Sequence, residues 1–176
     1  MPQTFLALAA VLCFTFLALS RQQSDQDVVR RAIAAEVDLA AVDVAQALMT
    51  RVERSAFDED DTARSGVRTQ PSAFPLGPDA GEDSPVDYDD VDDWMGYSGA
   101  ETATVGAGTL SFQTFAHVRY VDDDDISQPS ASATLTKEVT IVVVELRGST
   151  DRPPARAFLR RVVTPAGIAS ATPVTE

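Results

Sequence analysis

The densest group of side chains that could do chemistry is a set of aspartates near the middle of the chain. It precedes Gly96, and its members are Asp87, Asp89, Asp90, Asp92 and Asp93. Several carboxylate oxygens on a turning backbone are the ligands that Ca²⁺ prefers in proteins. The spacing lacks the Asp-x-Asp-x-Asp-Gly register and the terminal glutamate of an EF-hand. Calcium binding and a solvated acidic loop are both consistent with these residues, and residues 122–125 form a weaker second candidate. No other cofactor is expected.

Residues that could carry catalysis are few. His117 is the only histidine and lies on the polar face of a predicted strand. Cys13 is the only cysteine, so no disulfide can form within the chain. The sequence contains no Gly-x-Ser-x-Gly elbow and no glycine-rich phosphate loop. We therefore expect no enzymatic activity.

The charge balance is strongly acidic. The chain has 27 acidic and 14 basic side chains, for a formal net charge of −13, so long-range repulsion disfavours nucleic acid as a partner. Aspartate outnumbers glutamate by 19 to 8, and 13 of the 14 basic residues are arginine, which leaves Lys137 as the only lysine. This bias fits a salt-adapted (halophilic) proteome, although a GC-rich genome would also replace lysine by arginine.

An apolar segment occupies the N-terminus. Every residue from 5 to 19 except Thr15 is apolar, and no charge precedes Arg21. With the first four residues included, the segment reaches the length of a short membrane span, about 17–20 residues. We therefore predict that residues 1–23 form a transmembrane or filament-core helix. A cleaved signal peptide is the alternative, although a basic n-region and a clear cleavage site are missing. The basic residues after the segment would favour the cytoplasm for that side, so charge does not settle the orientation.

Residues 24–57 show the apolar spacing of an amphipathic stalk helix. This face can pack on the chain's own head or between subunits. A cap at Ser24 or Asp25 would interrupt the helix, whereas without a break residues 4–54 would form one rod of about 75 Å. The side chains expected to pack between subunits are Phe5, Leu8, Leu12, Phe16, Leu19, Val29, Ile33, Val37, Val44 and Leu48.

The remaining chain is predicted to form a loop, a head and a tail. Residues 58–105 are acidic and interrupted by prolines, which predicts loop structure, with Trp94 and Tyr97 pinning it to the head. Residues 106–165 contain strand patterns near 110–120, 135–147 and 155–164, and 166–176 form a C-terminal tail. The middle strand is apolar on both faces and should be central. The predicted fold class is α+β, a long N-terminal helix packed on a small antiparallel sheet of three or four strands.

Three segments carry a family resemblance. They are the helix exit 45–52 leading into Phe57-Asp58-Glu59, the Asp-Asp-x-Asp-Asp-Trp-Met-Gly-Tyr segment 89–97, and the Lys-Glu-Val-Thr-Ile strand 137–141. Together with the order of parts, they resemble type IV pilin-like proteins, including minor pilins and the pseudopilins of type II secretion. The chain departs from that family in lacking the usual prepilin leader ending in glycine and the glutamate in the apolar run.

The resemblance implies a structural subunit or assembly component of a pilus-like filament or pseudopilus. Its partners would be further copies or other pilin-like subunits, bound through helix packing, and membrane lipid before assembly. It implies a single-pass protein of the cell membrane with an extracytoplasmic head, or an extracellular filament. The alternative is a single-pass surface protein whose acidic head binds a partner or calcium without polymerising.

Overall fold

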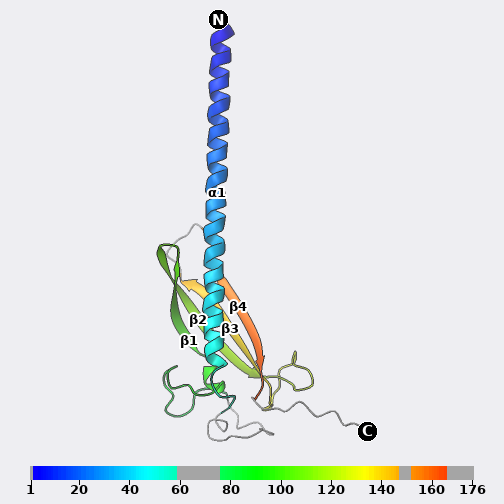
Figure 1. The fold of residues 1–176 in the computed structure, drawn as a ribbon. Coiled ribbons are helices and arrows are strands. Elements are labelled where there is room, and N and C mark those ends of the chain that lie inside the picture. Colours follow the sequence, from blue (N-terminus) through cyan, green and yellow to red (C-terminus); the bar gives the residue numbers. More distant parts are fainter. Residues whose placement is uncertain (1, 59–75, 147–151, 166–176) are drawn as a thin grey trace, which may run out of the picture. The chain divides into compact units, whose positions relative to one another are not determined.

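The computed structural model describes residues 2–58, 76–146 and 152–165, with the side chains of residues 2, 4, 5 and 7 outside the description (Figure 1). Its elements are α1 (Pro2–Val52), the 3₁₀ turn η1 (Asp92–Trp94), β1 (Ser98–Val105), β2 (Gly108–Tyr120), β3 (Lys137–Leu146) and β4 (Arg156–Val163). The chain divides into two units, Met1–Val37 and Asp38–Glu176. The predicted α+β class is confirmed: one long N-terminal helix packs on a four-stranded antiparallel sheet.

The helix continues through the position where a cap was considered. Ser24 lies inside α1, and its hydroxyl donates to the Ser20 carbonyl oxygen at 3.1 Å rather than capping a new helix. Of the two alternatives left open by the sequence, the structure therefore has the helix without a break. The helix also ends at Val52, five residues before the predicted boundary, because Ala56 forms a bridge to Asp90 and leaves the helical path.

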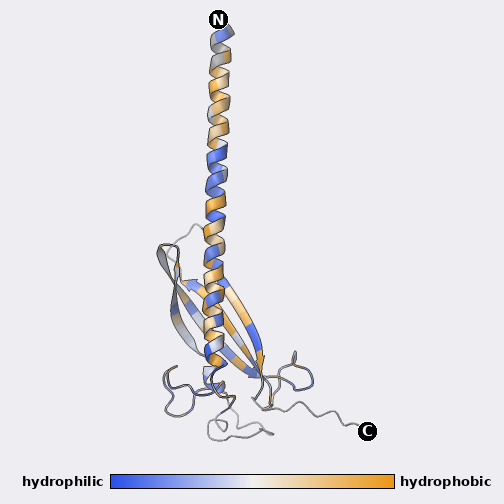
Figure 2. Ribbon diagram, in the orientation of Figure 1, coloured by the Kyte–Doolittle hydropathy of each residue, from blue (hydrophilic) through white to orange (hydrophobic). Residues whose placement is uncertain are grey.

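The first unit is a stretch of helix with exposed apolar side chains. Figure 2 shows predominantly hydrophobic turns near the N-terminus, followed by a hydrophilic band. Phe14 and Phe16 are 74% and 72% exposed. Within the helical residues whose side chains are described, no stretch is both long and apolar enough to cross a lipid bilayer.

In the second unit, the last turns of α1 form a core with the sheet. Salt bridges join the helix end to the sheet on two sides, from Arg51 to Glu101 of β1 and from Arg161 of β4 to Glu53. The core side chains alternate along the strands, as the period-two pattern predicts. Buried apolar residues of this core include Ala41, Ala45, Leu48, Met49, Val52, Phe112, Val118, Val139, Ile141 and Val143.

The sheet has one strand more than the three patterns found in the sequence. The segment Ser98–Val105 was placed within the acidic loop, but it forms β1 and pairs with β2 along its whole length. Its side chains are small or polar and none is fully buried, so the strand has no strong hydrophobic signal. Backbone pairing across the short turn at Gly106, whose φ is +56°, holds it in the sheet.

The other three strands lie close to their predicted positions. The strand order is β1-β2-β3-β4, so β3 is central and β4 is an edge strand, as expected. Arginines at exposed positions of β4 suit an edge that must avoid further pairing.

Gly99 of β1 is predicted to be sensitive to a single added methyl group. A Cβ at this position would come within 2.6 Å of Cζ of Tyr97, a ring packed at 5.1 Å against Trp94. We expect Gly99→Ala to lower the free energy of unfolding by about 1–3 kcal/mol through overpacking. Gly108→Ala is the matched control, because the nearest atom to its Cβ would lie at 3.7 Å. Equal thermal stability of the two variants would contradict this account.

Candidate functional site

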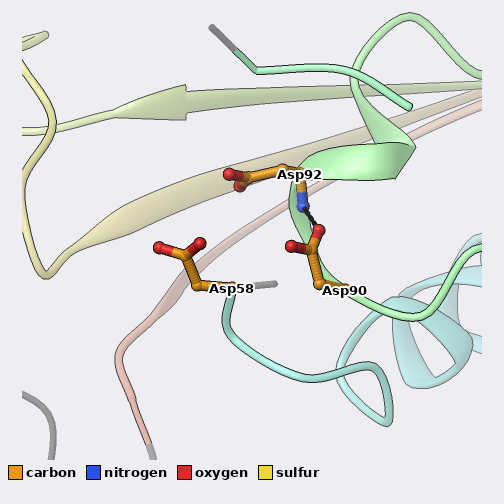
Figure 3. A group of neighbouring side chains, drawn as sticks. All are labelled: Asp58, Asp90 and Asp92. Carbon is orange, nitrogen blue, oxygen red and sulfur yellow. Dashed lines mark hydrogen bonds between the residues drawn. The ribbon is translucent and has the colours of Figure 1, made fainter. Parts of the chain in front are cut away.

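A buried charge cluster lies where the helix exit meets the start of β3. The chain after α1 runs beside the Asp-rich segment: the Ala56 amide donates to the Asp89 carbonyl at 2.8 Å, and the Val91 amide donates to the Ala56 carbonyl at 2.9 Å. This pairing brings Asp58 beside two aspartates more than thirty positions later, Asp90 and Asp92 (Figure 3). One carboxylate oxygen from each of the three lies within 4.8 Å of the others.

Lys137, the first residue of β3, supplies the positive charge of this cluster. It is 0% exposed, and its Nζ donates to the Phe57 carbonyl oxygen at 2.6 Å. The ammonium also contacts Oδ1 of Asp92 and lies 3.8 Å from Oδ2 of Asp58. The ring of Phe57, with its centroid 4.3 Å away, adds a cation–π contact. A lysine buried in this way is stabilised only because carboxylates and a carbonyl replace its water.

The cluster changes the protonation of its carboxyl groups. Burial raises the pKa of Asp92, and the neighbouring Lys137 ammonium opposes that rise. Burial, together with the negative charges of Asp92 and Asp93, raises the pKa of Asp90 to about 7. Burial likewise raises the pKa of the Tyr120 hydroxyl, which donates to Oδ2 of Asp92 at 3.5 Å. The lysine therefore shares a small volume with more carboxyl groups than one positive charge can balance.

Stability should depend on pH through Asp90. The folded head keeps a proton on Asp90 up to about pH 7, whereas the same carboxyl in the unfolded chain releases it near the ordinary pKa of 3.8. The stabilisation is therefore complete below pH 3.8 and is lost as the pH rises through about 7. We expect Asp90→Asn, which stays neutral, to be more stable than the wild type at pH 8 and less dependent on pH between 4 and 8.

The control for this prediction is Asp87→Asn, which removes an exposed carboxylate from the same segment. Denaturant unfolding across the pH range measures both variants. If Asp90→Asn and the wild type lose stability in parallel as the pH rises, Asp90 is not the titrating group.

The structure separates the five aspartates proposed as calcium ligands. Asp90 and Asp92 belong to the group with Asp58, in which Asp92 contacts the Lys137 ammonium, and a divalent cation beside that ammonium would be repelled. Asp89 and Asp93 form a second group with Glu82, in which the ligand oxygens lie within 4.8 Å of one another. Asp87 is exposed and belongs to neither group.

The second group also shapes the backbone. Oδ2 of Asp93 accepts hydrogen bonds from the amides of Asp89 and Asp90, both at 3.0 Å. Burial and a hydrogen bond with Asp93 raise the pKa of Glu82, because two carboxyl groups in contact are most stable when they share a proton. Glu82, Asp89 and Asp93 are therefore the residues that could hold a hard cation, and calcium binding remains a prediction for this smaller set.

The aromatic residues of the segment pin it to the head, as predicted. Trp94 is 1% exposed and meets the rings of Tyr88 and Tyr97 edge to face at 5.3 and 5.1 Å. Its indole nitrogen donates to the Ser55 hydroxyl at 3.3 Å, which joins the segment to the helix exit. Gly96 has φ of +81°, a conformation that favours glycine. The motif Asp-Asp-Trp-Met-Gly-Tyr thus has a structural role.

The remaining candidates for chemistry lie on the surface. His117 is exposed on β2, as predicted. The aspartates 122–125 are exposed in the loop after β2 and belong to neither carboxylate group. Cys13 is exposed on the first unit of the helix.

The residues predicted to pack between subunits fall into two sets. Leu8, Leu12, Phe16, Leu19, Val29 and Ile33 are more than half exposed on α1. Val37 and Leu48 are each 2% exposed and Val44 is half-buried, so this part of the stripe is covered within the chain. The side chain of Phe5 lies outside the described residues. The exposed set is the part of the predicted stripe that the described chain does not cover.

Sequence reasoning missed the roles of Lys137, Asp58 and Tyr120 in the buried cluster. One signal was present: a single lysine among thirteen arginines indicates a position where a compact ammonium is needed and a planar guanidinium does not fit. The pairing of the helix exit with residues 89–91 had no comparable signal, because it depends on contacts between distant segments.

Comparison with protein-family models, curated proteins and solved structures identified no match to this chain.

Proposed function

We propose that the chain is a non-enzymatic structural subunit of a type IV pilus-like filament or of a type II secretion pseudopilus, assembling through its N-terminal helix. One observation carries the proposal: apolar side chains on every side of the first unit of α1 are exposed. They include Leu6, Leu8, Val11, Leu12, Phe14, Phe16, Leu17 and Leu19, each at least 56% exposed.

Such a surface needs an apolar cover. A helix that is hydrophobic all round belongs in an interior, and burying one large apolar side chain contributes about 1.5–3 kcal/mol. A single neighbouring helix would cover one side only. A fibre core, in which each helix is surrounded by helices of other copies, covers all sides at once.

The polar band that follows supports cover by protein rather than by lipid alone. It contains charges of both signs, namely Arg21, Asp25, Asp27, Arg30 and Arg31. Exposed apolar side chains lie among these charges, at Val28 and Val29, and after them, at Ile33. Staggered copies can pair such charges and cover the apolar residues between them. Before assembly, membrane lipid would cover the more N-terminal apolar turns, with the head outside the cytoplasm.

The test is electron microscopy of the cell surface and membrane fractions, with mass spectrometry to identify this chain and its mature N-terminus. Fibres built from this chain, with the exposed apolar helix retained and protected from protease, support the proposal. Dispersed monomers, or a mature chain that lacks the apolar helix, would overturn it. The alternative of a surface protein with an acidic partner- or calcium-binding head would then take its place.

A further inference from the structure

The sheet face turned away from the core, called here the outer face, carries an exposed apolar row. Phe115 of β2, Val142 of β3 and Phe158 of β4 are partners in register across three strands. Phe115 is 42% and Phe158 69% exposed, and Leu146 on the same face is 49% exposed. Large apolar side chains gathered on one face, rather than scattered singly, are typical of a protein-binding surface.

The charged residues beside this row are mainly basic. On the described strands, the outer face carries Arg119, Arg156 and Arg160 against a single carboxylate, Glu138. Glu138 already pairs with Arg119 at 2.8 Å and with Arg160. Arg156 is exposed beside Val144, next to the apolar row. A basic, apolar face on a chain of net charge −13 is the surface to which an acidic segment of a second copy is attracted.

The loop 122–128 after β2 has the matching features. It presents four consecutive aspartates, followed by Ile126, which is 53% exposed. The loop is preformed: the Asp122 amide donates to the Gln128 carbonyl at 3.0 Å, and the Gln128 amide donates to the Asp125 carbonyl at 2.9 Å. Oδ1 of Asp122 also accepts from the Asp124 amide at 2.8 Å. An ordered loop loses little conformational entropy on binding.

We propose that the 122–128 loop of one subunit docks on the outer face of the next, with Ile126 against Phe115 and Phe158 and the aspartates beside Arg156 and Arg160. The contact joins two different surfaces of identical chains. Such a head-to-tail contact closes into a ring or extends as an open helical array, and it does not stop at a dimer. This proposal rests on the filament function and names the contact between heads that would accompany helix packing.

Cysteine cross-linking in cells that produce the full-length chain tests this geometry. The variant carries Cys13→Ser, Ser127→Cys beside Ile126, and His117→Cys on the outer face, which leaves the apolar row intact. A disulfide forms only where Cα atoms approach within about 7 Å. We expect a ladder of covalent dimers, trimers and larger species. Each single-cysteine variant should give no ladder, because one thiol per chain cannot link more than two copies.

Charge reversal then tests which residues make the contact. Asp124→Arg is chosen because Asp122, Asp123 and Asp125, and not the Asp124 side chain, accept the hydrogen bonds that hold the loop. We expect Asp124→Arg or Arg156→Glu alone to reduce the ladder about tenfold or more, and the two together to restore it. Asp83→Arg, at an exposed position in another loop, is the matched control and should leave the ladder unchanged.

The outcomes separate this inference from the filament function. Fibres that form normally while the two-cysteine variant gives no ladder, or only dimers, would overturn the docking contact and leave the function in place. A cross-link confined to single chains would also overturn it. A ladder that Asp124→Arg does not weaken would show that the heads meet without this charge pairing, and would overturn the proposed contact as well. The absence of both fibres and ladder would overturn the function and the contact together.

Discussion

Replacing Lys137 by methionine is expected to lower the free energy of unfolding of the head by about 3–5 kcal/mol, the cost of leaving a buried charge without its partner. The methionine would fill much of the same space, but it would leave Asp92 without the ammonium that it contacts and Asp58 without the ammonium 3.8 Å away. It would also leave the Phe57 carbonyl oxygen without its donor at 2.6 Å. Several buried polar groups therefore lose a partner in one substitution.

The measurement is denaturant unfolding of the full-length chain in detergent, followed by the fluorescence of Trp94. This tryptophan is the only one in the sequence and is 1% exposed, so its emission reports the state of the head. The double variant Lys137→Met with Asp92→Asn should recover part of the loss, because it removes one uncompensated charge. A loss below about 1 kcal/mol for Lys137→Met would contradict the role assigned to the cluster.

If the chain assembles into fibres as proposed, replacing Phe16 by arginine is expected to abolish their formation. Phe16 is 72% exposed, in the apolar part of α1. In a fibre core the new charge would be buried in every subunit, and an arginine at the centre of an apolar helix costs about 2.5–3.5 kcal/mol even when measured for insertion into a membrane. Because the same cost recurs at each added copy, the loss of fibres should be complete rather than partial.

Gln46→Arg provides the matched control, because it adds the same charge at an exposed polar position of the same helix, in the second unit and outside the band proposed to pack between copies. It should leave fibres intact. Counting fibres per cell by electron microscopy, with the amount of chain in the membrane fraction measured in parallel, separates failed assembly from failed production. Wild-type numbers of fibres from the Phe16→Arg variant would show that this side of the helix is not in the core.

The sequence predicted those parts of the fold that depend on local pattern. The alternation around Phe112 and Val118 placed β2, and the apolar stretch around Ile141 identified the central strand. It did not predict β1, because Ser98–Val105 is held mainly by backbone hydrogen bonds, which any sequence can supply. At Ser24 the sequence left a break and a continuous helix both open, because the same hydroxyl can cap a new helix or, as it does here, bond to its own helix.

The candidate site was predicted only in part, for a related reason. A run of aspartates looks uniform in sequence, yet the fold gives its members different environments. Asp92 contacts the buried lysine, Asp90 and Asp93 accept hydrogen bonds from backbone amides, and Asp87 remains in water. These differences follow from which distant segment each carboxylate meets, and that information is not contained in the spacing along the chain.

The burial of Lys137 has a practical consequence for labelling the protein. Because it is the only lysine and is 0% exposed, the native chain offers no side-chain amine to acylating dyes, aldehyde fixatives or lysine-specific proteases. Such reagents can reach only the terminal amino group while the head stays folded. Modification of Lys137 therefore reports opening of the head, and the rate of modification would measure how often the head opens.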